Sequence, residues 1–146
     1  MRLALVCSHG GHLTQMLEIM EAFEGHETFF LTHDSVRTRK LENAYLLPTI
    51  GTNIWRMAMS FLRIGEIFWR ERPDVVVSTG SEIAIPAFFV SRLLGTRTLF
   101  IETWARITSP SGTGRIVYFV ADAFFVQWKQ LLNCYGPRAH YEGGVF

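Results

Sequence analysis

The sequence predicts an α/β fold, a Rossmann-like doubly wound parallel sheet with helices on both faces. Three observations support this prediction. Short apolar runs typical of buried strands alternate along the chain with segments whose apolar residues recur every three or four positions. Glycine or proline stands at most of the junctions between them. The length of 146 residues suits one compact unit, so residues 1–146 are expected to form a single domain.

The first half of the chain contains two predicted strands and three predicted helices. Residues 3–7 are a continuous apolar run that stops at two glycines, as a strand buried on both faces does. Residues 13–25 follow with apolar side chains at helical spacing, and residues 28–32 form a second apolar run. A short helix is predicted at residues 35–43 and a long one at residues 53–70, before a proline.

The second half continues the alternation. Residues 75–78 form a third strand, and residues 82–94 form a helix that Gly95 caps. Residues 98–101 and, after a polar loop, residues 123–126 are the fourth and fifth predicted strands. Ligands of such folds bind outside the carboxyl ends of the strands, so the loops that follow the strands are where function is expected.

Composition excludes several classes of protein. Hydrophobic residues make up 49% of the chain and charged residues 18%, which is typical of a folded domain. The formal net charge of +1 argues against a nucleic-acid-binding protein. The two cysteines, Cys7 and Cys134, show neither metal-ligand spacing nor a disulfide framework. We therefore expect that the protein binds no metal and no cofactor and that it resides in the reducing cytoplasm.

The sequence contains no signal peptide pattern, because residues 1–7 lead straight into the first predicted strand. The most apolar stretches, residues 83–94 and 116–126, are shorter than the roughly 20 residues of a membrane-spanning helix. Any membrane contact is therefore expected to be peripheral.

The loop after the first strand, Ser8-His9-Gly10-Gly11-His12, is the first candidate anion site. Its glycines allow a tight turn that brings peptide N–H groups and a helix N-terminus to a phosphate. The competing interpretation is a tight turn without a ligand. His12 stands where the helix begins and is a candidate base, or else a packing or capping histidine.

Two further loops carry polar residues. After the third strand, Thr79-Gly80-Ser81 offers hydroxyls and backbone donors, although ordinary helix capping by Ser81 explains the same residues. After the fourth strand, Glu102 and Arg106 flank an indole, a combination common in carbohydrate sites. A structural ion pair between Glu102 and Arg106 is the alternative. A turn rich in glycine and hydroxyls follows at residues 109–115.

Several of these segments together resemble one family. The matching segments are residues 8–13, 73–86, 101–102 with Arg106, 111–118, 122–128 and 143–146. Their order and spacing, especially Gly114-Arg115 and Val126-Gln127-Trp128, are similar to those of the family that contains the membrane-associated subunit of the two-chain N-acetylglucosaminyltransferase of dolichol-linked oligosaccharide synthesis. PssD-like bacterial polysaccharide proteins belong to the same group.

The resemblance implies the N-terminal half of a GT-B glycosyltransferase similar to MurG, split over two polypeptides. This half would bind a lipid-diphosphate-linked sugar acceptor, while a partner chain would carry the UDP-sugar site. His12 or Glu102 would activate the acceptor hydroxyl, and GT-B enzymes do not generally require a metal. The residues expected to contact the acceptor or its diphosphate are Ser8, Gly10, Gly11, Thr79, Gly80, Ser81, Arg106, Thr113 and Gly114.

The eukaryotic members of this family carry an N-terminal transmembrane helix, whereas the first strand here begins at once. We therefore expect peripheral binding at the cytoplasmic face of the membrane through residues 53–70. Arg56, Arg63 and Arg70 recur every seven residues beside Trp55, which is typical of a basic interfacial helix. A helix packed on the sheet with a solvated arginine edge is the equally weighted alternative.

Two other functions remain open. A non-catalytic scaffold would recruit a transferase to the membrane without doing proton chemistry itself. A nucleotide-dependent oxidoreductase is disfavoured by the missing third glycine, although Asp34 follows the second strand roughly where a ribose-binding acid stands. The apolar tail, residues 143–146, is expected to contact the partner chain, and a terminal strand edge is the alternative.

Overall fold

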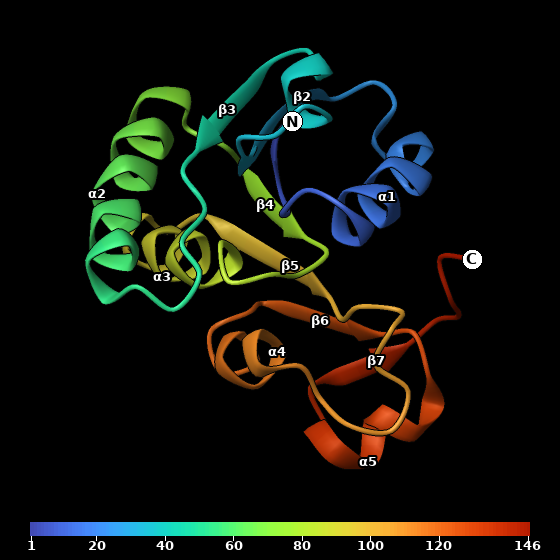
Figure 1. Cartoon of the computed structure of the whole chain (residues 1–146). Coiled ribbons are helices and arrows are strands. Elements are labelled where there is room, and N and C mark those ends of the chain that lie inside the picture. Colours follow the sequence, from blue (N-terminus) through green and yellow to red (C-terminus); the bar gives the residue numbers. More distant parts are fainter.

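The computed structural model describes residues 1–146 and contains one seven-stranded, entirely parallel sheet. The strand order is β3-β2-β1-β4-β5-β6-β7 (Figure 1). Consecutive strands are added outward from β1 to β3, and then on the other side from β4 to β7, so the order reverses between β1 and β4. The strands are β1 (Arg2–Val6), β2 (Glu27–His33), β3 (Ala44–Leu47), β4 (Val75–Ser78), β5 (Arg97–Ile101), β6 (Ala123–Val126) and β7 (Ala139–Tyr141).

Helices cover both faces of this sheet, with α1 on one face and α2 and α3 on the other (Figure 1). Alternate residues of β1 reach the two faces, because successive side chains of a strand point in opposite directions. Ala4 and Val6 join the larger core of 23 residues, and Leu3 and Leu5 join the smaller core of seven. The helices are α1 (Gly11–Glu18), α2 (Ile54–Glu71), α3 (Ala84–Leu94), α4 (Gly112–Val117) and α5 (Leu132–Tyr135).

The doubly wound fold and the five predicted strands are confirmed, but two strands and two helices were missed. The predicted helix at residues 35–43 is wrong: only a 3₁₀ turn, Thr38–Lys40, forms there, and β3 follows it. The predicted helix at residues 13–25 is shorter, because α1 ends at Glu18 and a 3₁₀ turn, Met20–Phe23, follows. The missed elements are β3, β7, α4 and α5.

The helix α2 forms where the sequence predicts it. The side chain of Asn53 accepts hydrogen bonds from the N–H groups of Trp55 (3.0 Å) and Arg56 (3.1 Å), which satisfies donors that the first turn leaves free. The helix ends at Glu71, and Arg72 caps it in the left-handed conformation, with φ 48°, just before Pro73.

None of the helices combines the length and the apolar character needed to cross a bilayer.

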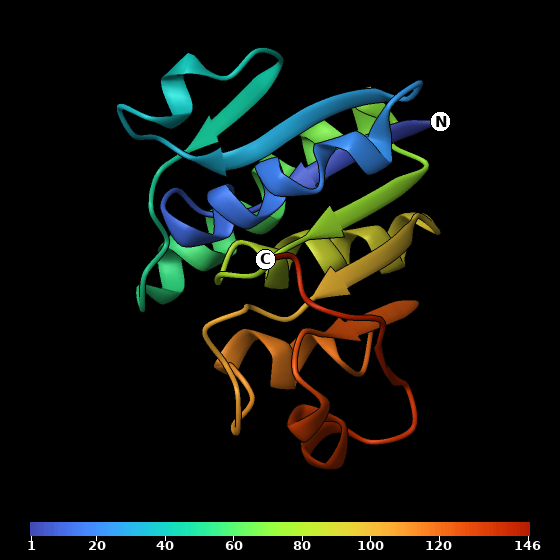
Figure 2. The same ribbon diagram turned by 90° about the vertical axis from the view of Figure 1, so that its right-hand side faces the viewer.

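The carboxyl ends of all strands lie along one edge of the sheet, because every pair of neighbours is parallel. Figure 2 shows the arrowheads directed to the same side, with the N terminus on the other. The loops after β1 and β4 are therefore neighbours, although Val6 and Ser78, which pair in register, are far apart in sequence. This position, where the strand order reverses, is where open α/β sheets bind ligands.

Candidate functional site

The loop after β1 leaves several backbone donors free. Gly10 has a positive φ of 85°, which few other residues adopt easily, and it turns the chain sharply into α1. No side chain caps this end of α1. The N–H groups of Gly10 and Gly11 also take part in none of the backbone hydrogen bonds of the loops. Together with the positive end of the helix dipole, these donors form a surface suited to an anion.

Reciprocal hydrogen bonds join this loop to the loop after β4. The Thr79 hydroxyl donates to the backbone carbonyl of His12 over 2.7 Å. In return, His12 Nδ1 donates to the backbone carbonyl of Thr79 over 2.9 Å. A proton on Nδ1 leaves Nε2 of the neutral ring as an acceptor, and the His12 side chain is only half-buried. The arrangement therefore presents a fixed imidazole with one nitrogen free to take a proton.

The next residue of the second loop is a glycine for a steric reason. A Cβ on Gly80 would lie 2.8 Å from both Cε1 and Nδ1 of His12, and Gly80 itself has a φ of 119°. No larger residue fits there without displacing the imidazole. The two loops thus pack tightly against each other at the point where the strand order reverses.

Helix capping by Ser81 is not what the structure shows. α3 begins at Ala84, its cap position is Ile83, and no side chain caps it. The Ser81 hydroxyl instead donates to the carboxylate of Glu82, and Ser81 has a positive φ of 79°. A residue other than glycine in this conformation is uncommon, and in structures generally such residues cluster at functional sites.

The third predicted loop contains Glu102 as a buried centre of hydrogen bonding. Its carboxylate, which is fully buried, accepts hydrogen bonds from the Ser111 N–H (3.0 Å), the Ser111 hydroxyl (2.8 Å) and the Tyr135 hydroxyl. Burial, together with the Glu102 charge, raises the pKa of Tyr135, so its hydroxyl remains a donor at neutral pH. The expected alternative, an ion pair with Arg106, is absent: Arg106 is exposed, with only the Ser109 hydroxyl nearby, at 3.5 Å.

Two glutamines, to which the sequence analysis assigned no role, connect α1 with the third loop. Gln15, on α1, donates to the Thr103 hydroxyl (3.2 Å) and accepts from the Trp104 N–H (2.9 Å). Gln127, just after β6, donates to the side chain of Gln15 (2.6 Å) and to the backbone carbonyl of Glu102 (3.0 Å). Both side chains are buried, so their partners are needed to offset the cost of desolvation.

The tail also meets this network. The Val145 N–H donates to Gln127 Oε1 over 2.9 Å, and the ring of Phe146 packs edge-on against Trp104 with centroids 5.7 Å apart. The last strand, β7, ends before the tail, so residues 143–146 are not a strand edge. Phe146 remains largely exposed.

The structure brings most of the expected site residues to one edge, in two groups. Those around the reversal point are Ser8, Gly10, Gly11, His12, Thr79, Gly80 and Ser81. In the third loop, Glu102 and Gly114 are buried beneath the surface, whereas Arg106 is exposed and Thr113 half-exposed. A Cβ on Gly114 would collide with Tyr135, Glu102 and Ser111, which explains the glycine by packing. Trp55, Arg56, Arg63 and Arg70 are all exposed along α2.

Comparison with known proteins gives a family and a fold. The family described as "Oligosaccharide biosynthesis protein Alg14 like" matches residues 26–145. The "UDP-N-acetylglucosamine transferase subunit ALG14" of Yarrowia lipolytica is 31% identical over 77% of this chain and 56% of its own length. The proteins of the same name from Saccharomyces cerevisiae and Homo sapiens are 28% and 27% identical, over 76% and 81% of this chain and 51% and 55% of their own lengths. The chain thus spans about half the length of these relatives.

Solved structures of similar fold are more distant in sequence. MurG of Acinetobacter baumannii superposes with a TM-score of 0.79 over 98% of this chain and 46% of its own, at 15% identity. A UDP-GlcNAc 2-epimerase from Methanocaldococcus jannaschii superposes with a TM-score of 0.75 over 99% of this chain and 47% of its own, also at 15% identity. These likenesses confirm the expected Rossmann-like fold.

Gly80→Ala tests whether the contact between the first two loops stabilises the fold. The new methyl group would collide with His12 and impose a strained backbone, so the variant should lose about 1–3 kcal/mol of unfolding free energy. Urea unfolding measures this loss. Gly11→Ala is the matched control, because a Cβ there meets nothing within 4 Å and the φ is not positive. Equal stability of the two variants would contradict the packing described here.

Proposed function

This chain belongs to the Alg14-like family of oligosaccharide biosynthesis proteins, and from this premise we propose that it is the acceptor-binding half of a two-chain glycosyltransferase of the GT-B type. The observation that carries the proposal is the pairing of free backbone donors with a fixed histidine where the strand order of the sheet reverses. The acceptor is a sugar linked to a lipid through a diphosphate.

The diphosphate is proposed to bind at the loops after β1 and β4. The free N–H groups of Gly10 and Gly11 and the N-terminus of α1 supply partial positive charge there. Arg106 is an exposed cation in the third loop, and we propose that its guanidinium pairs with a phosphate oxygen of the diphosphate. Thr79 is buried and hydrogen-bonded to His12, so its proposed role is to position His12 and not to contact the acceptor.

His12 is proposed to act as the general base. The acceptor hydroxyl attacks the anomeric carbon of the UDP-sugar, the bond to UDP breaks, and the hydroxyl proton passes to His12 Nε2. The Thr79 carbonyl, hydrogen-bonded to Nδ1, stabilises the imidazolium that forms.

Glu102 is proposed to support the site rather than to take the proton. Its carboxylate is fully buried and already accepts hydrogen bonds from Ser111 and Tyr135, so it holds the third loop in shape. Of the two residues that the resemblance offers as activating groups, His12 has the better access to a substrate hydroxyl.

The UDP-sugar site is proposed to lie on a partner chain. The proposal is supported by the names of the relatives, which are transferase subunits, and by the fold, which matches 46% of the MurG chain. The exposed Phe146 and Trp104, packed together beside the third loop, are proposed as part of the contact with that partner.

Membrane binding is proposed to occur through α2, at the cytoplasmic face. Trp55, Met59 and Leu62 are exposed on this helix, Trp55 by 79%. They lie beside the stripe formed by Arg56 and Arg63, and Trp55 and Met59 line a surface cavity of about 540 Å³ together with these two arginines. The N-terminal end of α2 lies at the carboxyl edge, because Gly51, just before it, contacts Glu82 after β4. A lipid held there would enter the membrane beside the diphosphate site.

The oxidoreductase alternative has no support in the structure. Asp34 forms a bidentate ion pair with Arg39, at 2.6 and 2.8 Å, and the family relatives are named transferase subunits. The non-catalytic scaffold remains the second candidate, because the buried position of Glu102 removes one of the two residues proposed for proton chemistry.

Transfer assays test the proposed chemistry. This chain, incubated with a donor-binding partner chain, UDP-N-acetylglucosamine and a lipid-diphosphate-linked sugar, should give product that neither chain forms alone. His12→Ala should lower the rate about 10²- to 10⁴-fold, as expected for loss of a general base. His140→Ala replaces an exposed histidine of β7 and should leave the rate unchanged. Full partner-dependent activity in His12→Ala would favour the scaffold instead.

Vesicle flotation tests the proposed membrane contact. Arg56→Gln, Arg63→Gln and Arg70→Gln combined should bind anionic vesicles at least about tenfold more weakly, since each arginine near such a surface contributes about 1 kcal/mol. The same change at Arg92, Arg97 and Arg115, which are also exposed, keeps the net charge equal and should bind like the unmodified chain. Equal weakening in both triple variants would show that overall charge, not this helix, drives binding.

A further inference from the structure

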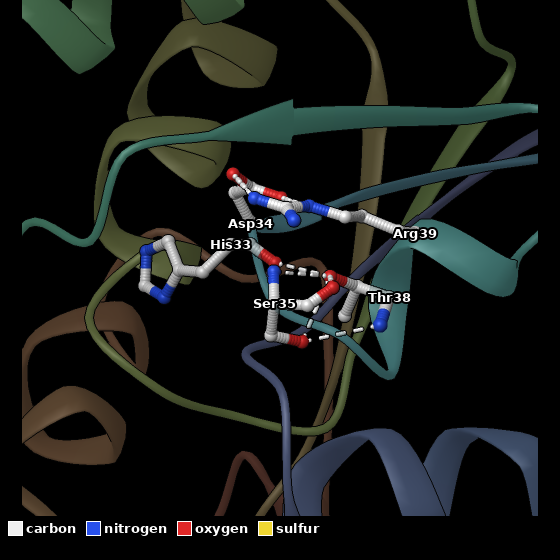
Figure 3. A network of polar contacts seen from close by, with 5 residues as sticks. All are labelled: His33, Asp34, Ser35, Thr38 and Arg39. Carbon is white, nitrogen blue, oxygen red and sulfur yellow. Dashed lines mark hydrogen bonds and ion pairs between the residues drawn. The ribbon is translucent and has the colours of Figure 1, made fainter.

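A carboxylate that the proposed chemistry does not use stands over a buried histidine near the reversal point. His33 is the last residue of β2 and is only 1% exposed, and its Nε2 atom is buried without a hydrogen-bond partner. The nearest carboxylate oxygen, Glu82 Oε1, lies 3.9 Å from this atom, beyond hydrogen-bond distance. Figure 3 shows the His33 ring pointing away from the Asp34–Arg39 ion pair and the Ser35–Thr38 contacts.

Two loops meet at this carboxylate, and a third lies near His33. Glu82 follows β4, and its carboxylate accepts hydrogen bonds from the Ser81 hydroxyl and from the Gly51 N–H at 3.4 Å, in the loop before α2. The ring of His9, in the loop after β1, lies 6.3 Å from the ring of His33. Glu82 therefore stands on the β2 side of the same edge at which His12 meets Thr79.

The backbone is strained at Ser81, the residue before Glu82. Ser81 has the left-handed φ of 79°, a conformation that costs a residue other than glycine about 1 kcal/mol or more. This conformation places the Ser81 hydroxyl on the Glu82 carboxylate. The side chain of Glu82 nevertheless remains 30% exposed. The Glu82 carboxylate is thus held by the Ser81 hydroxyl and lies near the buried His33, yet its exposed part can still accept further hydrogen bonds.

We propose that Glu82 binds a hydroxyl group of the acceptor sugar, with the Ser81 hydroxyl holding that carboxylate in place. The inference rests on the proposed function, because it assigns the sugar of the acceptor to a subsite beside the proposed diphosphate site.

The charge of Glu82 determines which part of the acceptor it binds. Burial by itself would raise the pKa of Glu82, but the hydrogen bonds that its carboxylate accepts, that from Ser81 first, outweigh burial and lower that pKa. Burial lowers the pKa of His33, which is therefore neutral at neutral pH. An ionised carboxylate accepts hydrogen bonds from hydroxyls and repels phosphate, so Glu82 recognises the sugar and not the diphosphate.

Two probes separate these contributions: an isoprenyl diphosphate, and the same isoprenyl diphosphate carrying N-acetylglucosamine. Their dissociation constants are measured with this chain and with Glu82→Gln. The unmodified chain should bind the sugar-bearing probe about 10- to 100-fold more tightly, and Glu82→Gln should lose most of this preference, since a hydrogen bond to a charged group is lost. Its affinity for the sugarless probe should stay equal or rise, because a negative charge has been removed.

Asp34→Asn is the matched control. It removes a carboxylate from the same edge of the sheet, but this one is paired with Arg39 and points away from His33 (Figure 3). It should keep the full preference for the sugar-bearing probe. Melting temperatures of both variants identify any loss of fold, and Glu82→Asp, which keeps the charge but shortens its reach, should lose part of the preference if the first variant is unstable.

An unchanged preference in Glu82→Gln and Glu82→Asp, or no preference in the unmodified chain, would overturn the inference while leaving diphosphate binding intact. Binding of neither probe by the unmodified chain would overturn both this inference and the proposed acceptor site.

Discussion

The reciprocal hydrogen bonds between His12 and Thr79 are the interaction on which the candidate site depends. Each residue uses its side chain to satisfy the backbone carbonyl of the other, across two loops that only the pairing of β1 with β4 brings together. The bond to Nδ1 selects the tautomer of the imidazole and leaves Nε2 available. The glycine at position 80 follows from this contact, because the ring occupies the space that a side chain would need.

A second network fixes the neighbouring loop by other means. Its members are buried amides and one carboxylate, and each finds a partner on another element: Gln15 on α1, Glu102 after β5 and Gln127 after β6. A buried network of this kind is costly when incomplete and rigid when complete. The site thus combines two loops with free backbone donors and, in the neighbouring loop, a buried polar network.

The sequence was sufficient for the parts of this structure that depend on local pattern. Continuous apolar runs identified the five central strands, and the glycines after β1 and β4 marked two loops that the fold makes neighbours. β3 was missed because Ala44–Leu47 is a short, half-buried edge strand whose residues follow no clear alternation. The hydrogen-bond partners of Glu102 were missed for a different reason. Its donors, Ser111 and Tyr135, come from later segments, and only the folded chain shows that they enclose it. The same holds for Glu82, which local pattern explains as a first-turn acid and whose buried neighbour, His33, is distant in sequence.

The central claim is that the loops after β1 and β4 bind the diphosphate of the acceptor. Nuclear magnetic resonance of the ¹⁵N-labelled chain, titrated with farnesyl diphosphate, tests it most directly. The account predicts that the amide signals of Gly10, Gly11 and Ser81 shift most and saturate together. Unchanged signals at these residues, with shifts confined to the opposite edge around Arg2 and Tyr45, where a polar cavity of about 600 Å³ lies, would contradict it.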